Sequence, residues 1–329
     1  MGSANSNDLS KVLTPELFEA LRRVHMPWAE DKPLDYYAVV KGFFGGEPDH
    51  RPEFYRLAFH QALKPLSELG VEYVPDLMQF LPPPEAPNFP SQALGLLLLL
   101  DQAPRSVFSG TNERYTYGYF DVLAQRVVLR LLALPAHLRP DSTARLMAQG
   151  WSREYALVAR FWFYTPLIHS ESEQYHEMQI ALMEDLRSEV EACVGKQDPG
   201  RATMKQDFED VYGFARLIRT APIHEGVGMD GFFFWLLRVI VVHVPIIRKF
   251  GHYPYRNNSL GRVSTEEEEQ YAKDTDYFAM QRDEEVIKKI RADVEAGKWS
   301  PLQDEPRFSG SKDGKIVAHT WSTVIGKQE

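Results

Sequence analysis

The sequence predicts an all-α protein, built as an irregular multi-helix bundle. Apolar residues recur at helical spacing along most of the chain, and the strict alternation that marks strands is scarce. Helix start signals recur as well: Thr14 followed by Pro15 places a capping side chain and then a proline at the first helical position. These observations favour helices packed on helices around a large core.

Further helices are predicted from their start and stop signals. Residues 170–173 place carboxylates in a first turn, where the helix dipole favours them, and Gly195 ends that helix. Gly251 follows the apolar run 232–247, which at roughly sixteen residues is short for a membrane span and is predicted to be one buried helix. The other expected starts are Ser91, Asn112, Asp141, Ser152, Thr203, Ser264 with Thr265, and Glu284.

The composition excludes several classes of protein. Of the 329 residues, 44% are apolar and 25% are charged, which suits a globular protein with a sizeable core. The formal net charge of −9, without a basic stripe, argues against a nucleic-acid partner. The one cysteine, Cys193, excludes internal disulfides, and we expect it in the core of a cytoplasmic protein. The chain carries no nucleotide-binding, metal-binding or nucleophile-triad signature, so we expect neither a cofactor nor a metal.

Proline-rich stretches at 82–90 indicate how the chain is divided. We expect an N-terminal helical segment at 1–85 that packs on a main helical domain at 86–298, followed by an irregular tail at 299–329. The proline-rich stretch itself is predicted to be a surface loop. No internal repeat indicates a solenoid.

Three polar clusters are expected at the ends of apolar helices, and the first is Asp101, Gln102 and Arg105. They come directly after the leucine run 96–100. An unpaired buried charge is costly, so these groups need partners. They either pair with neighbouring helix ends or bind a ligand.

The second cluster covers 161–171, where four aromatic residues lead into a proline turn and then His169. Near a helix N-terminus this ring should stay uncharged, which suits hydrogen bonding or proton acceptance; a structural histidine is the alternative. Glu173 and His176 stand three residues apart on the next helix and so share a face. Glu177 lies on the same helix. A single Glu-x-x-His copy is only half of a di-metal motif and does not predict a metal site.

The third cluster covers 243–258, after the apolar helix. It is rich in side chains that donate hydrogen bonds, among them His243, His252, Tyr255 and Arg256. A capping turn would use its glycine, prolines and asparagines equally well. Together, the three clusters offer donors beside abundant aromatic surface, which is how small-molecule pockets are lined.

At these clusters the chain resembles a family of bacterial and fungal proteins called domain of unknown function 924. The family motifs run D-Q-F-P-R-N, then F-F-Y-x-P-L-x-H-S-E, then H-R-D-I-I-E-R-F-G-R-F-P-H-R-N. The matching stretches here are 101–106, 161–171 and 243–257. The resemblance spans approximately 91–274 and implies a helical fold similar to tetratricopeptide-type superhelices. It implies no agreed activity.

The chain departs from the family in the third motif. Val244, Pro245 and Arg248 replace the family's charged positions, and His252 and Tyr255 replace an arginine and a histidine. This change suggests a more apolar lining, reshaped around a hydrophobic ligand. Fungal members of such families act in natural-product pathways, and the chain looks similar to one of them, a norbornene-forming Diels–Alderase.

The leading hypothesis is a cofactor-independent cyclase that catalyses an intramolecular [4+2] cycloaddition on an apolar terpenoid or polyketide intermediate. Its expected partner is that small hydrophobic molecule, with no nucleic acid and no membrane span. The expected catalytic residues are Arg105, His169, His176, His252, Tyr255 and Arg256. The expected substrate-binding residues are Asp101, Gln102, Trp162, Phe163, Glu171, Glu177, Phe233, Trp235 and His243.

Two other hypotheses stay open. One is a non-catalytic helical module that binds a peptide or a partner protein. The other is a hydrolase or isomerase in which His169 or His176 is the general base and Glu171 or Glu177 orients it. The enzyme hypotheses require the three clusters to meet around an apolar hollow. Substrate and oligomeric state are open at this stage.

Overall fold

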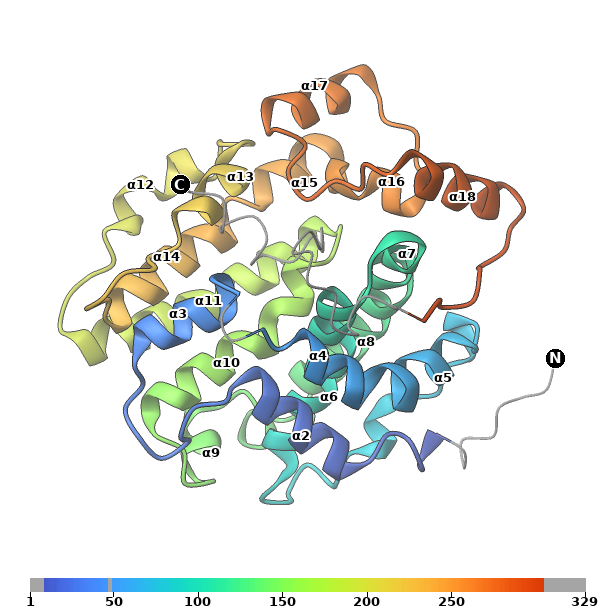
Figure 1. Ribbon diagram of the computed structural model, residues 1–329. Helices are drawn as coiled ribbons and strands as arrows, with labels where there is room; N and C mark the ends of the chain where they lie inside the picture. The colour runs from blue at the N-terminus through green and yellow to red at the C-terminus, as the bar shows by residue number, and fades with distance from the viewer. Residues whose placement is uncertain (1–8, 47–48, 305–329) are drawn as a thin grey trace. The chain divides into compact units, whose positions relative to one another are not determined.

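The computed structural model describes residues 9–46 and 49–304 (Figure 1). In these ranges the regular structure is helical and no strand occurs, which confirms the predicted all-α class. The chain forms two compact units, each drawn from separated stretches of sequence. Unit 1 takes in the described residues up to Pro33, His50–Pro166 and the described residues from Ala296 on; unit 2 takes in those of Leu34–Asp49 and Leu167–Glu295. The expected boundary after residue 85 falls inside unit 1, and 305–329 of the expected tail lie outside the described residues.

Unit 1 consists of α-helices joined by short 3-10 and π-helical turns, which carry η labels. In chain order its elements are α2 (Pro15–His25), α4 (Arg51–Phe54), η1 (Tyr55–Leu63), α5 (Lys64–Ser67), η2 (Val71–Tyr73), η3 (Leu77–Phe80), α6 (Phe89–Val107), η4 (Gly110–Asn112), α7 (Glu113–Tyr115), η5 (Thr116–Phe120), α8 (Asp121–Leu132), η6 (Ala136–Leu138), α9 (Thr143–Met147) and α10 (Arg153–Ile168). The last two residues of α10 belong to unit 2.

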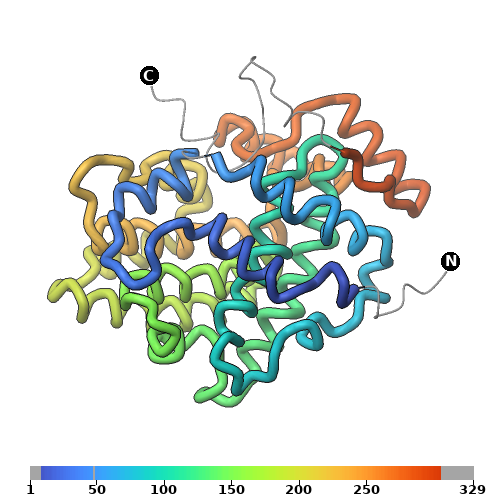
Figure 2. Tube along the Cα trace, turned by 60° about the horizontal axis from the view of Figure 1, so that its bottom comes forward, coloured from blue at the N-terminus to red at the C-terminus, as the bar shows by residue number. Residues whose placement is uncertain are grey.

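Helix α6 forms the centre of unit 1 and is buried along nearly its whole length. Helix α2 lies beside it (Figure 2). A Cβ atom at Gly95 would lie 2.2 Å from the backbone oxygen of Phe18, so only glycine permits this close approach of two backbones. Thr14 caps α2 as predicted, since its hydroxyl accepts a hydrogen bond from the backbone N–H of Leu17 at 3.3 Å.

Residues 298–304 form a strap that returns to unit 1 and lies across η4 and α7 (Figure 1). The guanidinium of Arg114 lies 4.1 Å from the ring centroid of Trp299. The side-chain amide of Asn112 donates to the carbonyl of Gln303 at 2.8 Å and accepts from its N–H at 2.9 Å. The described part of the predicted irregular tail is thus without helix, yet firmly bound.

Unit 2 is also helical, and Figure 2 traces most of it from yellow to orange. Its elements are α3 (Tyr36–Phe44), α11 (Glu173–Val194), α12 (Gly200–Asp207), α13 (Gly213–Leu217), η7 (Ile218–Thr220), α14 (Met229–Val241), α15 (Val244–Phe250), η8 (Pro254–Arg256), α16 (Asn257–Leu260), α17 (Glu266–Asp274) and α18 (Glu284–Glu295). Helix α11 packs against α14 and α15.

Two predicted helices of unit 2 are each divided in the structure. The apolar run 232–247 forms α14 and α15 instead of one helix, because Pro245 lacks the N–H that would continue the first and sits in the opening turn of the second. The helix expected from Thr203 stops at Asp207, and a turn follows in which the carboxylate of Asp210 accepts from the N–H of Tyr212 at 3.1 Å.

Other local predictions are confirmed, with one exception. Thr265 and Glu268 form a reciprocal capping box at the start of α17. Gly195 and Gly251 end α11 and α15 in the left-handed conformation, with φ of 70° and 73°. The prediction of a core position for Cys193 is wrong, because this residue lies on the exposed face of α11.

The stretch Met229–Phe250, which contains α14 and α15, is long and apolar enough to cross a membrane. However, 78% of its most apolar window is buried inside the protein. The core helix of a soluble protein has the same length and composition, so the absence of a membrane span stays a prediction.

Candidate functional site

The second motif ends α10 and opens α11 through a turn at residues 168–171. Helix α10 continues through Pro166 to Ile168, so the predicted proline turn is wrong. Pro166 has no N–H for the carbonyl of Trp162, and the hydroxyl of Thr165 donates to that carbonyl instead, at 3.0 Å. The proline is thereby tolerated within the helix, and the bend begins only at His169.

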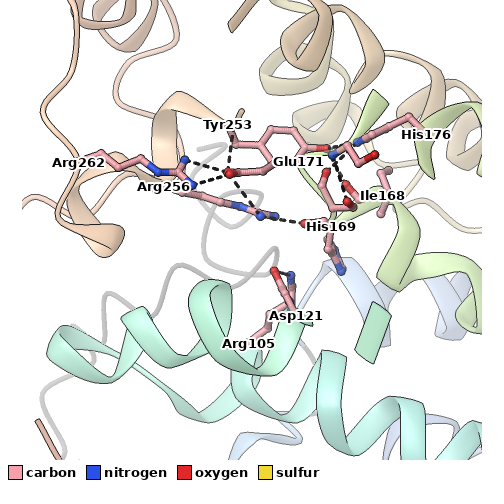
Figure 3. Close-up of polar contacts among 11 residues, drawn as sticks. Arg105, Asp121, Ile168, His169, Glu171, His176, Tyr253, Arg256 and Arg262 are labelled. Atoms are coloured by element: carbon pink, nitrogen blue, oxygen red, sulfur yellow. Dashed lines mark hydrogen bonds and ion pairs between the residues drawn. The ribbon is translucent and has the colours of Figure 1, made fainter. Parts of the chain in front are cut away.

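Three consecutive carbonyl oxygens of this turn are bound by side chains of unit 2, an arrangement that we call the turn clamp (Figure 3). The hydroxyl of Tyr253 donates to the carbonyl of Ile168 at 2.6 Å. Nη1 of Arg256 donates to the carbonyl of His169 at 2.8 Å. Nε2 of His176 lies 3.0 Å from the third carbonyl. The clamp fixes the backbone of the turn at every step.

The carboxylate of Glu171 completes the clamp. It accepts from Nη1 and Nη2 of Arg262 at 3.1 and 2.5 Å, and from the backbone N–H of Tyr253 at 3.2 Å. Nη1 of Arg256 lies 3.9 Å away. Burial alone would raise the pKa of Glu171, but the two guanidinium groups outweigh it and bring the pKa below its ordinary value. Glu171 therefore stays ionised and committed to these partners.

The ring of His176 is held in one tautomer. Tyr253 uses its single proton on the carbonyl of Ile168, so the nearby Nε2 of His176, at 3.2 Å, carries the proton that the carbonyl of Ser170 accepts. Burial, together with the positive charge of Arg256, lowers the pKa of His176 to about 4. The ring is neutral at pH 7.

His243 extends this buried polar region. Its Nδ1 lies 2.7 Å from the carbonyl of Val239, and its ring packs on Phe214 with centroids 3.8 Å apart. Burial lowers the pKa of His243 well below its ordinary value, and His176 and Arg256 lower it further. Two neutral histidines thus lie near one permanent cation.

The side chain of His169 behaves differently from the backbone of the turn. Figure 3 shows its imidazole pointing away from Tyr253 and Glu171. The residue is 5% exposed. Since the clamp holds the backbone through Arg256, the imidazole projects from a fixed point.

The first motif occupies the last turns of α6, which ends at Val107, so its predicted place at a helix end is confirmed. Nη1 and Nη2 of Arg105 contact the carboxylate of Asp121 at 2.7 and 2.9 Å. Asp101 lies 3.5 Å from the same guanidinium, accepts from Gln102 at 2.5 Å, and has its carboxylate 3.1 Å from Oγ1 of Thr165, whose one proton is shared with the carbonyl of Trp162. Both carboxylates are almost fully buried. The arrangement fits the structural ion pair weighed from the sequence.

Trp162 lies in unit 1 against a histidine that the sequence did not single out. His25, the last residue of α2, packs edge-on against it with ring centroids 4.2 Å apart. Burial and the neighbouring His50 lower the pKa of His25 to about 3. This ring is neutral, and no sequence motif marks it.

The remaining predicted residues are dispersed. Tyr255 stacks on Tyr253 with centroids 5.1 Å apart and so joins the turn clamp. The other positions are these: Phe163 and Phe233 are core residues, Glu177 is exposed on α11, His252 pairs with Glu268 at 2.7 Å, and Trp235 donates to the carbonyl of Leu217 at 3.1 Å.

The clamp depends on two residues that the sequence prediction missed. Tyr253 lies inside the third motif, where its position between Gly251 and Pro254 could have marked it. Arg262 lies beyond the motif and carries no local signal. Glu173, weighed above with His176, pairs with Arg248 at 2.6 Å, and His176 bonds to the turn.

Two of the surface grooves of unit 1 lie away from the motifs. One, of about 430 Å³, is lined by Val74, Pro75, Asp76, Leu77, Leu123, Arg126, Val127, Leu129 and Arg130. The other, of about 520 Å³, is lined by Arg23, Met26, Pro27, Trp28, Ala29, Glu30, Asp31 and Gly150. No predicted site residue lines either groove.

The sequence motifs are brought together in pairs. The first meets the second in unit 1, through Asp101 and Thr165. The second meets the third in unit 2, at the turn clamp. Within the clamp the polar groups bind one another, so the donors that remain for a guest are fewer than the sequence suggested.

The protein is all-helical in its described residues. Its buried polar contacts include the turn clamp in unit 2 and the contacts of Arg105 with Asp101 and Asp121 in unit 1. A family model described as a bacterial protein of unknown function (DUF924) matches residues 83–276, more than half of the chain, and includes all three motifs. The chain belongs to this family. No curated protein and no solved structure matches it.

Proposed function

We propose that the protein is a cofactor-independent enzyme that acts on an apolar small molecule. The reaction proposed is an intramolecular [4+2] cycloaddition of a terpenoid or polyketide polyene, similar to that of the fungal norbornene-forming Diels–Alderase. One observation carries the proposal: the turn clamp fixes the backbone of His169 and leaves its imidazole directed away from the clamp.

A cycloaddition makes modest chemical demands. Two new carbon–carbon σ bonds form from π bonds of the same molecule, and no proton, electron pair or leaving group is exchanged with the protein. The rate rises when the flexible chain is held folded with its reacting carbons close together. It rises further when a hydrogen-bond donor polarises a carbonyl on the dienophile.

His169 is the proposed catalytic residue. A donor accelerates a reaction most when its position is set beforehand, because no reorganisation is then needed as charge develops. The clamp supplies this through Arg256, which binds the carbonyl of His169 at 2.8 Å. Arg256, Tyr253 and Glu171 are positioning residues in this proposal.

Proton transfer by a hydrolase or isomerase is the second candidate, favoured by the same placement of His169. The structure leaves fewer residues for the roles of base and orienter than the sequence allowed. His176 bonds to the carbonyl of Ser170, and Glu171 is engaged by two arginines, so neither is available as base or orienter. His169 is the remaining candidate base.

A binding module without catalysis is favoured by one observation, the groove beside α8 in unit 1. Most of its lining residues are apolar, among them Val74, Leu77 and Val127. A helix or an extended peptide could lie there. This candidate predicts a stable partner and no turnover.

The test uses the full-length protein and linear trienes that end in an α,β-unsaturated aldehyde. We expect one enantiomer of the cycloadduct in excess, formed faster than in buffer. His169→Phe should remove the excess. His169→Gln keeps a donor, so it should retain part of the cycloaddition but no base catalysis. His137→Gln, at an exposed position, is the matched control. A racemic product at the buffer rate with every triene would overturn the proposal.

A further inference from the structure

The core of unit 2 contains a glutamine that no motif marks. Gln179 lies on α11 and is 0% exposed. Neither its Nε2 nor its Oε1 has a hydrogen-bond partner among the described residues. A buried amide with both atoms unmatched is unusual, because each atom loses its bonds to water without replacement.

The surroundings of Gln179 follow from its place on the helix. It lies three residues after His176, so both point from the same face of α11, which packs against α14 and α15. Met183 and Leu186 continue that buried face. The Nε2 of His176 is already committed to the turn clamp. The amide therefore lies between the ring of His176 and the apolar side chains of Met183 and Leu186 along this face.

A chain under no other demand would place methionine or leucine at this position. Methionine has nearly the same length and shape as glutamine and would fill the space without leaving polar atoms unmatched. Glutamine at this position has a physical reason if a bound molecule supplies one hydrogen-bond donor for Oε1 and one acceptor for Nε2. A hydroxyl group is the smallest group that does both.

We infer that the amide of Gln179 binds a hydroxyl oxygen inside unit 2. Nε2 donates to that oxygen, and the hydroxyl proton is accepted by Oε1. A ketone, an ester or an ether satisfies only Nε2. Where the hydroxyl belongs to a substrate, this inference rests on the proposed function and specifies its substrate class, an apolar molecule with an alcohol group. A buried water presents the same chemistry.

The experiment compares two probes that differ in one group, geraniol and geranyl methyl ether, on the full-length protein by titration calorimetry. We expect the unsubstituted protein to bind the alcohol about tenfold more tightly, the worth of one good hydrogen bond. Gln179→Met should bind both probes equally. Gln92→Met, at a buried glutamine of α6 in unit 1, should keep the preference and serves as control.

The melting temperature without probe distinguishes the two sources of the hydroxyl. For a substrate alcohol, Gln179→Met should melt no lower than the unsubstituted protein. For a resident water, neither probe is preferred and Gln179→Met melts lower by about 2 °C or more, because water-mediated bonds are lost. No preference together with an unchanged or higher melting temperature overturns the inference, as does a preference that survives in Gln179→Met. Binding is read without turnover, so the inference can stand if the cycloaddition fails.

Discussion

The hydroxyl of Tyr253 lies 2.6 Å from the carbonyl oxygen of Ile168, a residue 85 positions earlier in the chain. This bond joins the third family motif to the second. It also fixes the proton on the neighbouring ring of His176. Because the backbone N–H of Tyr253 also donates to the carboxylate of Glu171, this one residue holds the 168–171 turn at two points.

Tyr253→Phe should reduce the free energy of unfolding by about 1–3 kcal/mol, since a buried carbonyl loses its donor. Urea unfolding measures the change. Tyr73→Phe, at a residue that is 84% exposed, should change it by less than about 0.5 kcal/mol. Equal effects of the two substitutions would contradict the assigned role of the Tyr253 hydroxyl.

The buried histidines predict acid sensitivity. The pKa of His25 is about 3, that of His176 about 4, and that of His243 well below 6.5. Below pH 6.5 the unfolded chain takes up protons at these rings and the folded chain does not. Their contribution is therefore complete above pH 6.5 and is lost as the pH falls toward 4.

At pH 5, His25 and His176 should each lower the free energy of unfolding by about 2 kcal/mol relative to neutral pH, and His243 should act in the same direction. Urea unfolding between pH 7 and pH 5 measures the slope. His176→Gln should remove the part of the pH dependence of the unfolding free energy that this histidine contributes. His137→Gln, at an exposed position, should leave that pH dependence unchanged. A slope unaffected by His176→Gln would refute the assignment.

Arg105 neutralises two buried carboxylates, those of Asp101 and Asp121. Arg105→Met should therefore lower the free energy of unfolding by about 3–5 kcal/mol, since uncompensated charge remains in the core. Adding Asp121→Asn should recover part of the loss. If the double variant is no more stable than Arg105→Met, uncompensated charge on Asp121 is not the cause of the loss.

Gly95→Ala should destabilise unit 1 by about 1–3 kcal/mol, because its Cβ would lie against the backbone of α2 at Phe18. Thermal unfolding measures the shift. Gly231→Ala, in α14, is the matched control: its Cβ would meet only the side chain of Val227, and alanine favours the helix. We expect little net change there. Similar losses at both sites would indicate a general sensitivity to the added methyl group.

Local chemistry made part of the fold predictable. Thr14 and Thr265 mark helix starts because their hydroxyls bond to N–H groups within three residues. Pro166 misled the prediction of the turn, since the hydroxyl of Thr165 takes up the carbonyl that the proline leaves free. The period of apolar residues could not reveal that the helix ends at Asp207 and that a turn at Asp210 follows.

The candidate site was only partly predictable. His169, Glu171 and Arg256 stand out in the sequence as polar groups beside apolar helices. Arg262 does not, because only the folded chain brings it to Glu171, 91 positions away. The spacing of residues within a motif cannot indicate which of its polar groups will form hydrogen bonds or ion pairs with other groups of the motifs.

The strap at 298–304 has a consequence for biosynthesis. Its contacts with Arg114 and Asn112 complete unit 1, and α3 of unit 2 precedes most of unit 1 in the chain. A ribosome releases the chain from its N-terminus. Unit 1 therefore cannot be completed until Leu167–Glu295 of unit 2 has been translated, and the surface of α7 stays uncovered in the nascent chain until Gln303 has emerged.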